Sequence, residues 1–275
     1  MKPIISFFAC ATGALYEDLL PMYAFYALSS HQSIGRAFVE IVVVDVNNFI
    51  ERHHSSLAWL FNTFSSYNDT LGPICVRAYS GDHRKRTNYT NTWRFLEVPS
   101  QPAKYTYLGD IDVFLTESVL DEKRMKQMAL FGLPYSNIVR NYNTLKRRLT
   151  GVMLVETERF YTPALIRAQA SVDATGNDEM FLYNIVEASK IGVPPSNSTS
   201  PLLTYRPLHG THLSPNRGPN KRMCLPFDLA KMLSVNLLQE YLRSDGMATA
   251  FLNATTAKVD EQNNKKMKES NGVCQ

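Results

Sequence analysis

The chain has 275 residues, 44% of them hydrophobic, which suits one large α/β domain or two small ones. Its formal net charge is only +4, and part of the basic charge lies in two short runs, Arg84-Lys85-Arg86 and Lys265-Lys266-Met267-Lys268. This distribution indicates no broad basic face and therefore argues against a nucleic-acid partner. The first run suits a ligand that carries phosphate, or else it is a solvated loop.

Cysteine spacing and hydropathy indicate the class of protein. The sequence contains four widely separated cysteines, Cys10, Cys75, Cys224 and Cys274. Because no two are closely spaced, they argue against a zinc site or a disulfide scaffold. Residues 4–11 imitate a secretory signal only loosely, since the apolar run is short and Glu17 and Asp18 follow it, so we interpret them as a core strand. No run approaches the roughly 20 apolar residues of a membrane span. We therefore expect a cytoplasmic protein without a membrane span.

The first half of the chain alternates strand and helix signals. Strands are expected at Ile4–Ala11, Phe38–Val46, Ile74–Tyr79 and Tyr105–Leu115, and helices at Leu15–Ser30 and Phe49–Phe64. The near-continuous β-branched run of the second strand is typical of a strand that is buried on both faces. This βαβαβ order predicts a parallel sheet with right-handed crossovers.

The second half is more mixed. Strands are expected at Met128–Pro134 and Gly151–Glu156, helices at Thr162–Ala170 and Asp178–Ser189, and a final helix within Leu225–Phe251. The segment from Pro194 to Pro226 is rich in Pro, Ser, Asn and Gly and predicts a loop, and long loops inside compact domains usually carry function. We expect a single domain over residues 1–250, followed by a polar tail at residues 257–275.

Two carboxylates lie at the end of the fourth expected strand, in Tyr107-Leu108-Gly109-Asp110-Ile111-Asp112-Val113. Successive side chains of a strand point to opposite faces, so Asp110 and Asp112 are expected to share one face and to bind one hard cation. Burying two unpaired carboxylates would be costly. The alternative is a turn capped by Asp110, which explains one aspartate and not the second.

The strand ends predict where a ligand binds, because ligands of open α/β sheets lie beyond the carboxyl ends of the strands. The first strand ends at Ala11-Thr12-Gly13, the second at Asp45, and the fourth at the aspartate pair. We expect all three at one rim, with a nucleotide across the first two and its diphosphate near a metal at Asp110 and Asp112.

An imidazole ligand is expected from Leu208-His209-Gly210-Thr211-His212 in the long loop. We expect His209 to bind the metal and keep His212 as the second choice, the alternative being a loop imidazole without a special role. Carboxylate oxygens suit Mg²⁺ or Mn²⁺, and an added imidazole favours Mn²⁺. The adjacent Gly210 would let backbone approach a phosphate.

The segment Tyr107–Val113 resembles the Asp-x-Asp signature of GT-A fold glycosyltransferases, which use nucleotide sugars. Arg94, sixteen residues before Asp110, matches a basic residue that contacts the donor in the glycogenin and bacterial galactosyltransferase family. Thr150-Gly151-Val152-Met153-Leu154-Val155 resembles that family's Asn-x-Gly-Val strand, which lines the sugar site. The chain differs from the family at Gly109, where an apolar residue or Asp is usual, and at Thr150, where Asn is common.

The resemblance continues to roughly residue 222. Asn177-Asp178-Glu179 falls where the family has an acidic or amide cluster that opens a helix, although the cluster itself differs. His209-Gly210 resembles its late metal-binding histidine and glycine, while the final lysine of the phosphate motif has no clean counterpart. The start of the chain also resembles glycosyltransferases encoded by large algal DNA viruses, which would place the protein in a host cytoplasm.

The resemblance implies a GT-A α/β fold with a mixed central sheet, in which residues 1–115 form a Rossmann-like nucleotide-binding half and residues 116–250 an acceptor-binding half. It implies a metal-dependent enzyme that transfers a hexose or pentose from a UDP-sugar to a hydroxyl of a glycan or glycoprotein. Two other classes stay open, a metal-dependent nucleotidyltransferase and a catalytically silent carbohydrate-binding protein. The sugar, the stereochemistry and the oligomeric state are not predicted.

The expected site residues follow from the chemistry and the resemblance together. The metal ligands are Asp110, Asp112 and His209. The donor contacts are Ala9, Cys10, Ala11, Thr12, Asp45, Arg94, Asp110, Ile111, Gly151, Gly210 and His212, and Val152 lies beside Gly151. The catalytic candidates are Asp178 and Glu179, one of which would serve as base. The alternative for Asp178 is an ordinary helix-start acid that the macrodipole favours.

Overall fold

The structure is a computed structural model that describes residues 4–244 apart from 35, 66–71, 102, 141–144, 175–176, 196–208 and 213–231. Most of the loop expected between Pro194 and Pro226 lies outside these residues, as does the expected tail at residues 257–275. The final helix expected within Leu225–Phe251 is described only in part, and there it contains α10 (Leu238–Ser244).

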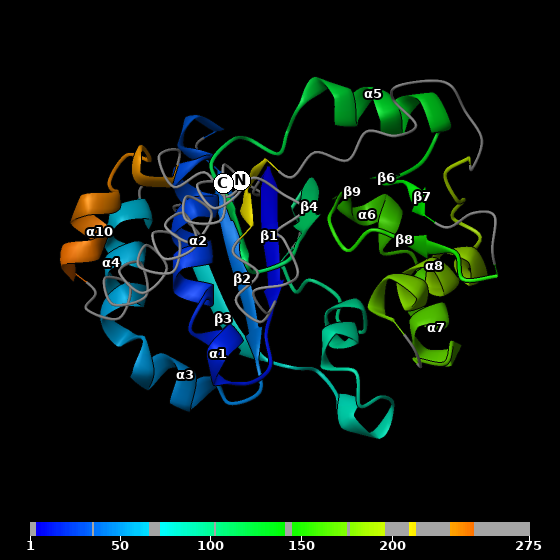
Figure 1. The fold of residues 1–275 in the computed structure, drawn as a ribbon, viewed down its shortest axis with the longest axis horizontal. Coiled ribbons are helices and arrows are strands. Elements are labelled where there is room, and N and C mark those ends of the chain that lie inside the picture. Colours follow the sequence, from blue (N-terminus) through cyan, green and yellow to red (C-terminus); the bar gives the residue numbers. More distant parts are fainter. Residues whose placement is uncertain are drawn as a thin grey trace, which may run out of the picture.

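A six-stranded sheet of order β3-β2-β1-β4-β9-β6 forms the centre of the molecule (Figure 1). Its strands are β1 (Ile5–Cys10), β2 (Ala37–Val43), β3 (Ile74–Ala78), β4 (Tyr105–Leu108), β6 (Tyr135–Ser136) and β9 (Met153–Glu156). The first four are parallel, whereas β9 is antiparallel to both β4 and β6. The predicted α/β class, with parallel strands in the first half and a mixed central sheet, is confirmed.

Helices cover both faces of the sheet, so the core has two parts. Phe7 and Ala9 of β1 point to the face covered by α2 (Leu20–Ser29), α4 (His54–Phe64) and α10. Phe8, between them, points to the face covered by α7 (Pro163–Ser171), α8 (Asp178–Ser189) and η4 (Thr90–Phe95). This alternation is the pleat of a strand buried on both sides.

The remaining helices connect these layers. They are α1 (Ala14–Glu17), η1 (Gln32–Ile34), α3 (Val46–Arg52), η3 (His83–Lys85), α5 (Glu122–Phe131) and α6 (Thr157–Phe160). Two small antiparallel pairs, β5 (Val113–Leu115) with β10 (Gly210–His212) and β7 (Val139–Arg140) with β8 (Arg148–Leu149), complete the described elements. Each of the two helices expected in the first half is divided into two, α1 with α2 and α3 with α4.

The strand expected at Met128–Pro134 is wrong, because most of this segment belongs to helix α5. Asp121 caps the start of α5 by accepting a hydrogen bond from the amide of Arg124 at 2.9 Å. Gly132 ends it with φ of 65°, a left-handed conformation that glycine adopts without penalty. The buried side of α5 includes Arg124 and Gln127, so its apolar periodicity is weak and the apolar run at its end reads as a strand.

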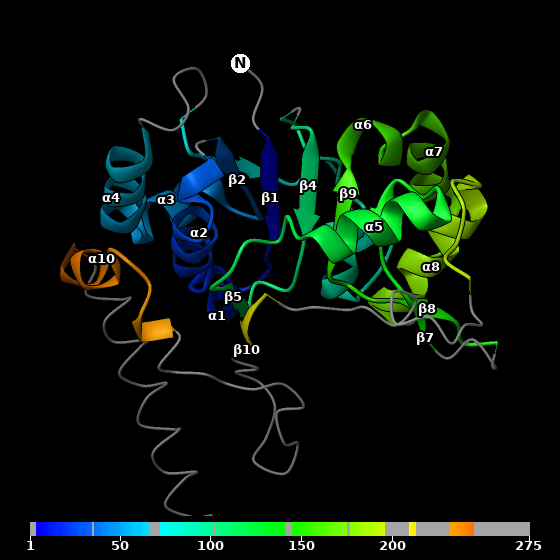
Figure 2. The same ribbon diagram turned by 90° about the horizontal axis from the view of Figure 1, so that it is seen from above.

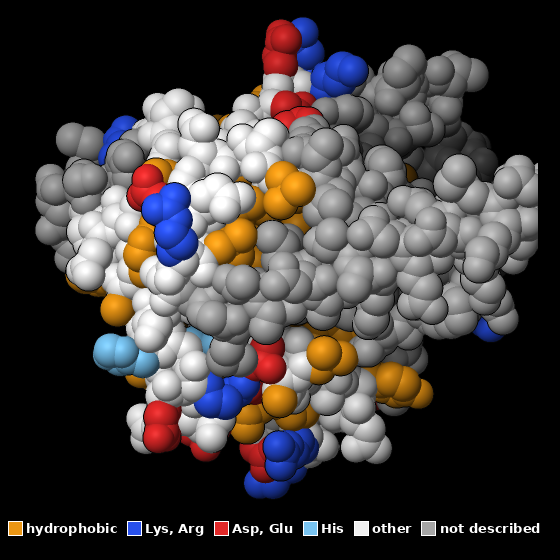
Figure 3. Space-filling view, turned by 60° about the vertical axis from the view of Figure 1, so that its left-hand side comes forward, with side chains coloured by type: hydrophobic (Ala, Val, Ile, Leu, Met, Phe, Trp, Pro, Cys, Tyr) orange, Lys and Arg blue, Asp and Glu red, His pale blue; other side chains and the backbone are white. Residues whose placement is uncertain are grey.

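The two views place the small strand pairs at one edge of the large sheet. In Figure 2 the carboxyl ends of β1 and β4 point toward β5 and β10, and β7 and β8 lie along the same edge. Figure 3 shows a different face, where apolar side chains occur in small groups among charged and other polar ones over the described residues. No helix in the described part of the chain combines the length and apolar character that crossing a bilayer requires.

Candidate active site at the carboxyl edge of the sheet

The aspartate pair lies in a turn between two strands of different sheets. The strand expected over Tyr105–Leu115 ends at Leu108, and the chain resumes as β5 at Val113 after a turn in which the Val113 amide donates to the Asp110 carbonyl at 3.0 Å. Asp110 and Asp112 therefore do not share a face through strand alternation, and the prediction that they do is wrong. Ile111, expected near the donor, is a buried core residue at 7% exposure.

Asp112 faces His212 across the β5–β10 pair. The register sets His212 opposite Val113, and its Nε2 lies 3.2 Å from Oδ2 of Asp112. The side chains are 8% and 15% exposed, respectively. Gly210 makes this pairing possible, because a Cβ there would overlap the carbonyl of Phe114. The missing side chain of Gly210, expected to admit a phosphate, thus admits the neighbouring strand.

His209 lies in a separate cluster. Its Nε2 is 2.7 Å from Oδ2 of Asp121 and 3.3 Å from Nε of Arg124. Burial and then Arg124 lower the pKa of His209, against the opposing effect of Asp121. The backbone of His209 is left-handed, with φ of 55°, and its carbonyl accepts from the amides of Thr116 and Glu117. Of the two histidines, His212 and not the expected His209 contacts the aspartate pair.

Arg94 joins the aspartate turn to the start of α8. Its Nη1 donates to Oδ1 of Asp110 and, at 3.3 Å, to the carbonyl of Gly109, while Nη2 donates to Oδ2 of Asp178 at 2.8 Å. Burial lowers the pKa of Arg94, but the two carboxylates outweigh it and raise the pKa above its ordinary value. Gly151 lies against this guanidinium, since a Cβ there would overlap Nη2 and lie 3.2 Å from Cζ of Arg94.

Glu179 is held by a different pair of arginines. Both carboxylate oxygens lie 2.8 Å from Nη1 of Arg140, and one lies 3.8 Å from Nη1 of Arg148. These arginines come from β7 and β8, the hairpin at the same edge of the sheet. Asn177 caps α8 by accepting from the Glu179 amide at 2.9 Å, so Asp178 and Glu179 occupy the first turn and point to two different arginine partners.

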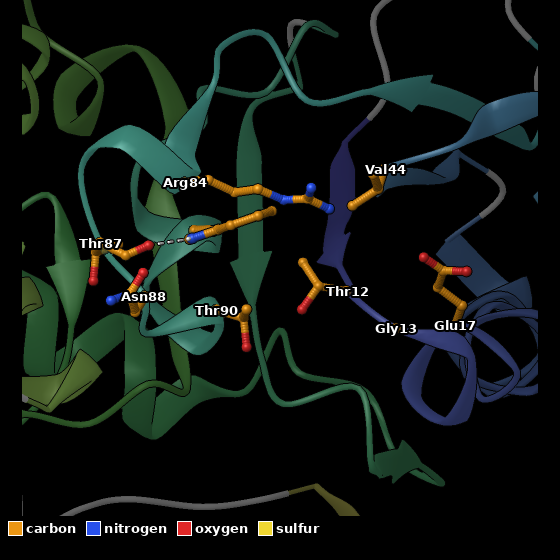
Figure 4. A pocket seen from close by; sticks show the side chains of 9 residues that line it. Thr12, Gly13, Glu17, Val44, Arg84, Thr87, Asn88 and Thr90 are labelled. Atoms are coloured by element: carbon orange, nitrogen blue, oxygen red, sulfur yellow. Dashed lines mark hydrogen bonds between the residues drawn. The ribbon is translucent and has the colours of Figure 1, made fainter.

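A pocket of about 570 Å³ lies beyond the ends of β1 and β2 (Figure 4). It is lined by Thr12, Gly13, Glu17, Val44, Arg84, Thr87, Asn88, Thr90 and Trp93. Of the residues expected to hold a base, Thr12 lines this pocket. Ala9 is fully buried in the core instead. The carbonyl of Ala11 accepts a hydrogen bond from the Tyr79 hydroxyl at 3.3 Å. Cys10, the last residue of β1, is half-buried.

Asp45 is exposed and caps helix α3, where its Oδ1 accepts from the Asn48 amide at 3.0 Å. It follows Val44, which lines the pocket. The capping bond gives Asp45 a structural role at the edge where a contact to base or ribose was expected. Val152, beside Gly151, is a core residue at 3% exposure.

Arg84, from the basic run expected to suit a phosphate-bearing ligand or to form a solvated loop, lines the pocket. Other residues of this edge were not anticipated from the sequence. Arg140 and Arg148 carry no motif and are recognisable only through their contact with Glu179. Asp121 is a helix-cap position by its sequence context, but its contact with His209 is a long-range one that no local pattern predicts.

The residues near Asp112 fit a divalent cation in part. Two ligands at right angles, each about 2.1 Å from the ion, lie about 3 Å apart, and the two atoms Oδ2 of Asp112 and Nε2 of His212 are 3.2 Å apart. An oxygen and an imidazole nitrogen form a donor set that suits Mn²⁺. Among the described residues, no three His, Cys, Asp or Glu side chains converge as a complete metal site. Asp110, the other aspartate of the pair, is bonded to Arg94.

No protein-family model matches the chain, and no curated protein sequence matches it. Among solved structures, it is similar to the apo form of the glycosyltransferase GlyE from Streptococcus pneumoniae TIGR4, at 12% identity and a TM-score of 0.42 over 69% of this chain and 44% of that chain. A second GlyE structure has 11% identity and a TM-score of 0.39 over the same shares.

The chain is also similar to the galactosyltransferase LgtC, solved in complex with donor and acceptor sugar analogs. The identity is 11% and the TM-score 0.44, over 89% of this chain and 95% of that chain. The chain spans 44% of the length of the GlyE chains. At these identities and TM-scores the likeness assigns no function to this chain.

Proposed function

We propose that the chain is a metal-dependent glycosyltransferase that moves a hexose or pentose from a UDP-sugar to a hydroxyl of a glycan or glycoprotein acceptor. The observation that carries the proposal is the convergence at one sheet edge of the Asp112–His212 pair and the Asp110–Arg94–Asp178 bridge. A pocket of about 570 Å³ opens at the same edge, beyond the ends of β1 and β2, and its volume is in the range of small-molecule sites.

In this proposal Asp112 and His212 hold Mn²⁺ or Mg²⁺, and Asp110 joins them or binds the donor ribose. His209 acts as an anchor for β10, in place of the ligand role first expected for it. When bound, the cation supplies Lewis-acid stabilisation of negative charge on the leaving diphosphate. Replacing Asp112 by Ala removes a charged ligand and should nearly abolish turnover while the protein remains folded.

In the proposed reaction the bond between the anomeric carbon of the sugar and the diphosphate oxygen breaks, and a bond to the acceptor oxygen forms. The sugar gains oxocarbenium character while charge builds on the leaving oxygen, as in glycoside hydrolysis. Arg94 is a fixed positive charge at this edge, preorganised by Asp110 and Asp178, and would stabilise that developing charge without reorganisation. Asp178 would orient the donor sugar, and either Asp178 or Glu179 would receive the acceptor proton if the reaction inverts the anomeric centre.

The proposal assigns binding of the donor's nucleotide to residues 1–115 and binding of the acceptor to residues 116–250. Uridine is preferred because of the sequence resemblance, and the pocket between Thr12 and Arg84 is its proposed location. Gly151 is proposed to lie at the boundary between the two halves, where Arg94 fills the space that a side chain would take.

The test is a screen of nucleotide sugars for Mn²⁺-dependent hydrolysis and transfer, with nucleoside triphosphates in parallel. Release of UDP from a UDP-sugar supports the proposal. Release of pyrophosphate from a triphosphate would identify a nucleotidyltransferase, and sugar binding without turnover would identify a silent carbohydrate-binding protein. His212→Gln should reduce Mn²⁺-dependent turnover by at least about 10²-fold, the scale of a lost preorganised group. The matched variant His209→Gln should retain more activity, and the reverse order would restore His209 as the ligand.

A further inference from the structure

The segment between β3 and η4 contains η3 and forms one wall of the pocket; it is called the η3 turn below. Arg84 lies in this turn and extends its guanidinium across the pocket toward Val44 (Figure 4). Among the described residues no carboxylate forms an ion pair with Arg84, whereas its neighbour Lys85 pairs with Asp82 at 3.3 Å. Across the pocket, Glu17 is already paired with Arg52 at 2.6 Å. Arg84 therefore presents its charge to whatever occupies the pocket.

Glu97, a fully buried carboxylate, holds the η3 turn. Its Oε1 accepts from the amide and the hydroxyl of Ser80 at 2.7 and 2.9 Å and lies 2.6 Å from Nε2 of His83. Its Oε2 accepts from Nη1 of Arg77 at 2.6 Å. Burial raises the pKa of Glu97, but the hydrogen bonds from His83, Arg77 and Ser80 outweigh it and lower the pKa to about 2. The carboxylate thus stays ionised and bonded at both ends of the segment Ser80–His83.

Aromatic packing fixes the ring of His83 as well. It lies edge-on between Tyr79, at 5.4 Å between ring centroids, and Trp93, at 5.9 Å. The Tyr79 hydroxyl donates to the carbonyl of Ala11 at the end of β1, and Trp93 lines the pocket. His83 is thereby tied to the sheet on one side and to the pocket wall on the other, and it immediately precedes Arg84.

We propose that Arg84 binds the nucleoside diphosphate of the donor and that Glu97, acting through His83, is the residue that positions it. The inference rests on the proposed function, since it assigns a ligand class to that pocket. A guanidinium donates to phosphate oxygens and to carbonyl oxygens of a base, so the ligand it favours carries such acceptors on the side facing the η3 turn. Neither residue belongs to the Asp-x-Asp turn or to the Arg94 bridge, so their contribution is to binding and not to the chemical step.

The experiment is calorimetry of UDP in the presence of Mn²⁺, together with donor kinetics, on the full chain. Arg84→Ala should weaken UDP binding by about 10-fold or more, the scale of a lost charge-assisted hydrogen bond. His83→Phe keeps a ring between Tyr79 and Trp93, removes the bond to Glu97, and should raise the donor KM by several-fold with kcat unchanged. Glu97→Gln should act in the same direction, and His83→Phe is the variant to rely on if that protein does not fold. Lys85→Ala is the matched control and should bind UDP like the wild type.

A double-mutant cycle separates positioning from general structure. If His83 acts through Arg84, adding His83→Phe to Arg84→Ala should weaken UDP binding no further, whereas independent effects would add. Additive losses, or an Arg84→Ala protein that binds like the wild type, would overturn this inference and leave the proposed function standing. A wild-type protein that binds no UDP with Mn²⁺ would overturn both.

Discussion

At the scale of single residues, Arg94 connects the parts of the candidate site. It contacts Asp110 from the turn after β4 and Asp178 from the start of α8, which are far apart in the sequence. A buried cation between two carboxylates is stabilising only while all three charges keep their geometry, and removing one partner leaves an uncompensated charge. Residues that restrict the position of this guanidinium therefore matter as much as the residues that bond to it.

Gly151→Ala tests this restriction. A Cβ at position 151 would overlap Nη2 of Arg94, so the guanidinium must shift from Asp178 or Asp110. We expect transfer to fall by about 10²-fold, the cost of a displacement near 1 Å in a preorganised site, with a stability loss of about 1–3 kcal/mol from overpacking. Gly132→Ala is the control. Alanine in the left-handed conformation of position 132 would strain the end of α5, which should lower the melting temperature without lowering transfer per folded molecule. Equal activity of the Gly151→Ala protein and the wild type would show that Arg94 is not fixed in place.

Asp178→Asn and Glu179→Gln compare the two acids of the first turn of α8. Both changes keep size and remove charge, so UDP affinity should stay within about twofold, whereas at least one should lower transfer by about 10²-fold or more, the scale of a lost acid–base group. We expect the larger effect from Asp178, because Arg94 links it to the Asp110 turn. Single-turnover kinetics and UDP calorimetry provide the two readouts. Full activity in both variants would reduce this turn to a helix cap.

At the scale of elements, the β5–β10 pair decides which histidine meets the aspartate turn. Its register sets His212 opposite Val113, the residue after Asp112, while His209 is outside the pair and bonded to Asp121. A shift of the pairing by one residue would turn His212 to the other face. The metal proposal therefore depends on the register of a three-residue strand.

Gly210→Ala should disturb that register. A Cβ there would overlap the carbonyl oxygen of Phe114 and lie 2.7 Å from its carbonyl carbon, and backbone atoms cannot yield as a flexible side chain does. We expect Mn²⁺ affinity to fall by about 10-fold or more, because metal sites lose that much when ligand orientation is lost. Hydrogen exchange of the amides of β5 should accelerate in the same variant. Unaltered Mn²⁺ affinity with slow exchange would show that β10 tolerates the added methyl group.

Local sequence patterns predicted those helices and strands whose ends are set by residues close by in the sequence. The expected helix Asp178–Ser189 agrees with α8 at both ends, since its start is set by acids behind an asparagine cap. The strand expected over Tyr105–Leu115 failed because apolar residues flank the turn on both sides, and hydrophobicity does not reveal that β5 leaves the sheet of β4 to pair with β10. A pattern along the chain identifies burial, while the partner of a strand depends on distant residues.

The same limit applies to the site. Asp110, Asp112, Arg94 and Asp178 were singled out from the sequence, and the structure brings Arg94 together with Asp110 and Asp178. The choice between His209 and His212 needed the strand register, and the role of Gly151 needed the side chain that packs on it. Glu97 and Arg140 belong to no motif, and only their contacts with His83 and Glu179 reveal them.

At the scale of the whole molecule, His31 couples the helical layer to the segment that follows β5. Its ring is fully buried, with Nδ1 2.8 Å from the carbonyl of Ala27 in α2 and Nε2 accepting from the amide of Val119 at 3.0 Å. Burial first, and His209 to a lesser degree, lower the pKa of His31 to about 4, although the bond to Ala27 opposes them. The native state therefore keeps this ring neutral.

Folding stability should consequently decrease in mild acid. The unfolded chain takes up a proton at His31 near pH 6.5 and the folded chain only near pH 4, so the stability contributed by the neutral ring is complete above pH 6.5 and lost as the pH falls toward 4. The difference amounts to about 3 kcal/mol. Urea unfolding of the wild type and of His31→Gln at pH 7, 5.5 and 4 would measure it, because the variant should lack the part of the pH dependence that His31 contributes. Parallel pH profiles of the wild type and the variant would contradict this assignment. Glu97 contributes at lower pH, because its stabilisation is lost only as the pH falls from about 4.5 toward 2.

The antiparallel direction of β9 determines which segments of the chain reach the candidate site. In an all-parallel sheet only the segments that leave strands reach the ligand edge, but here the segment that enters β9, with Gly151, reaches it beside the segment that leaves β4. The segments before β9 and after β4, which the proposed function assigns to the acceptor and to the donor, thus come from neighbouring strands that run in opposite directions. The β7–β8 pair, which precedes β9, lies outside the connections of β1 to β4. If residues 116–250 bind the acceptor, as proposed, changes in the segment that contains β7 and β8 would alter acceptor preference and leave the strands β1 to β4 as they are.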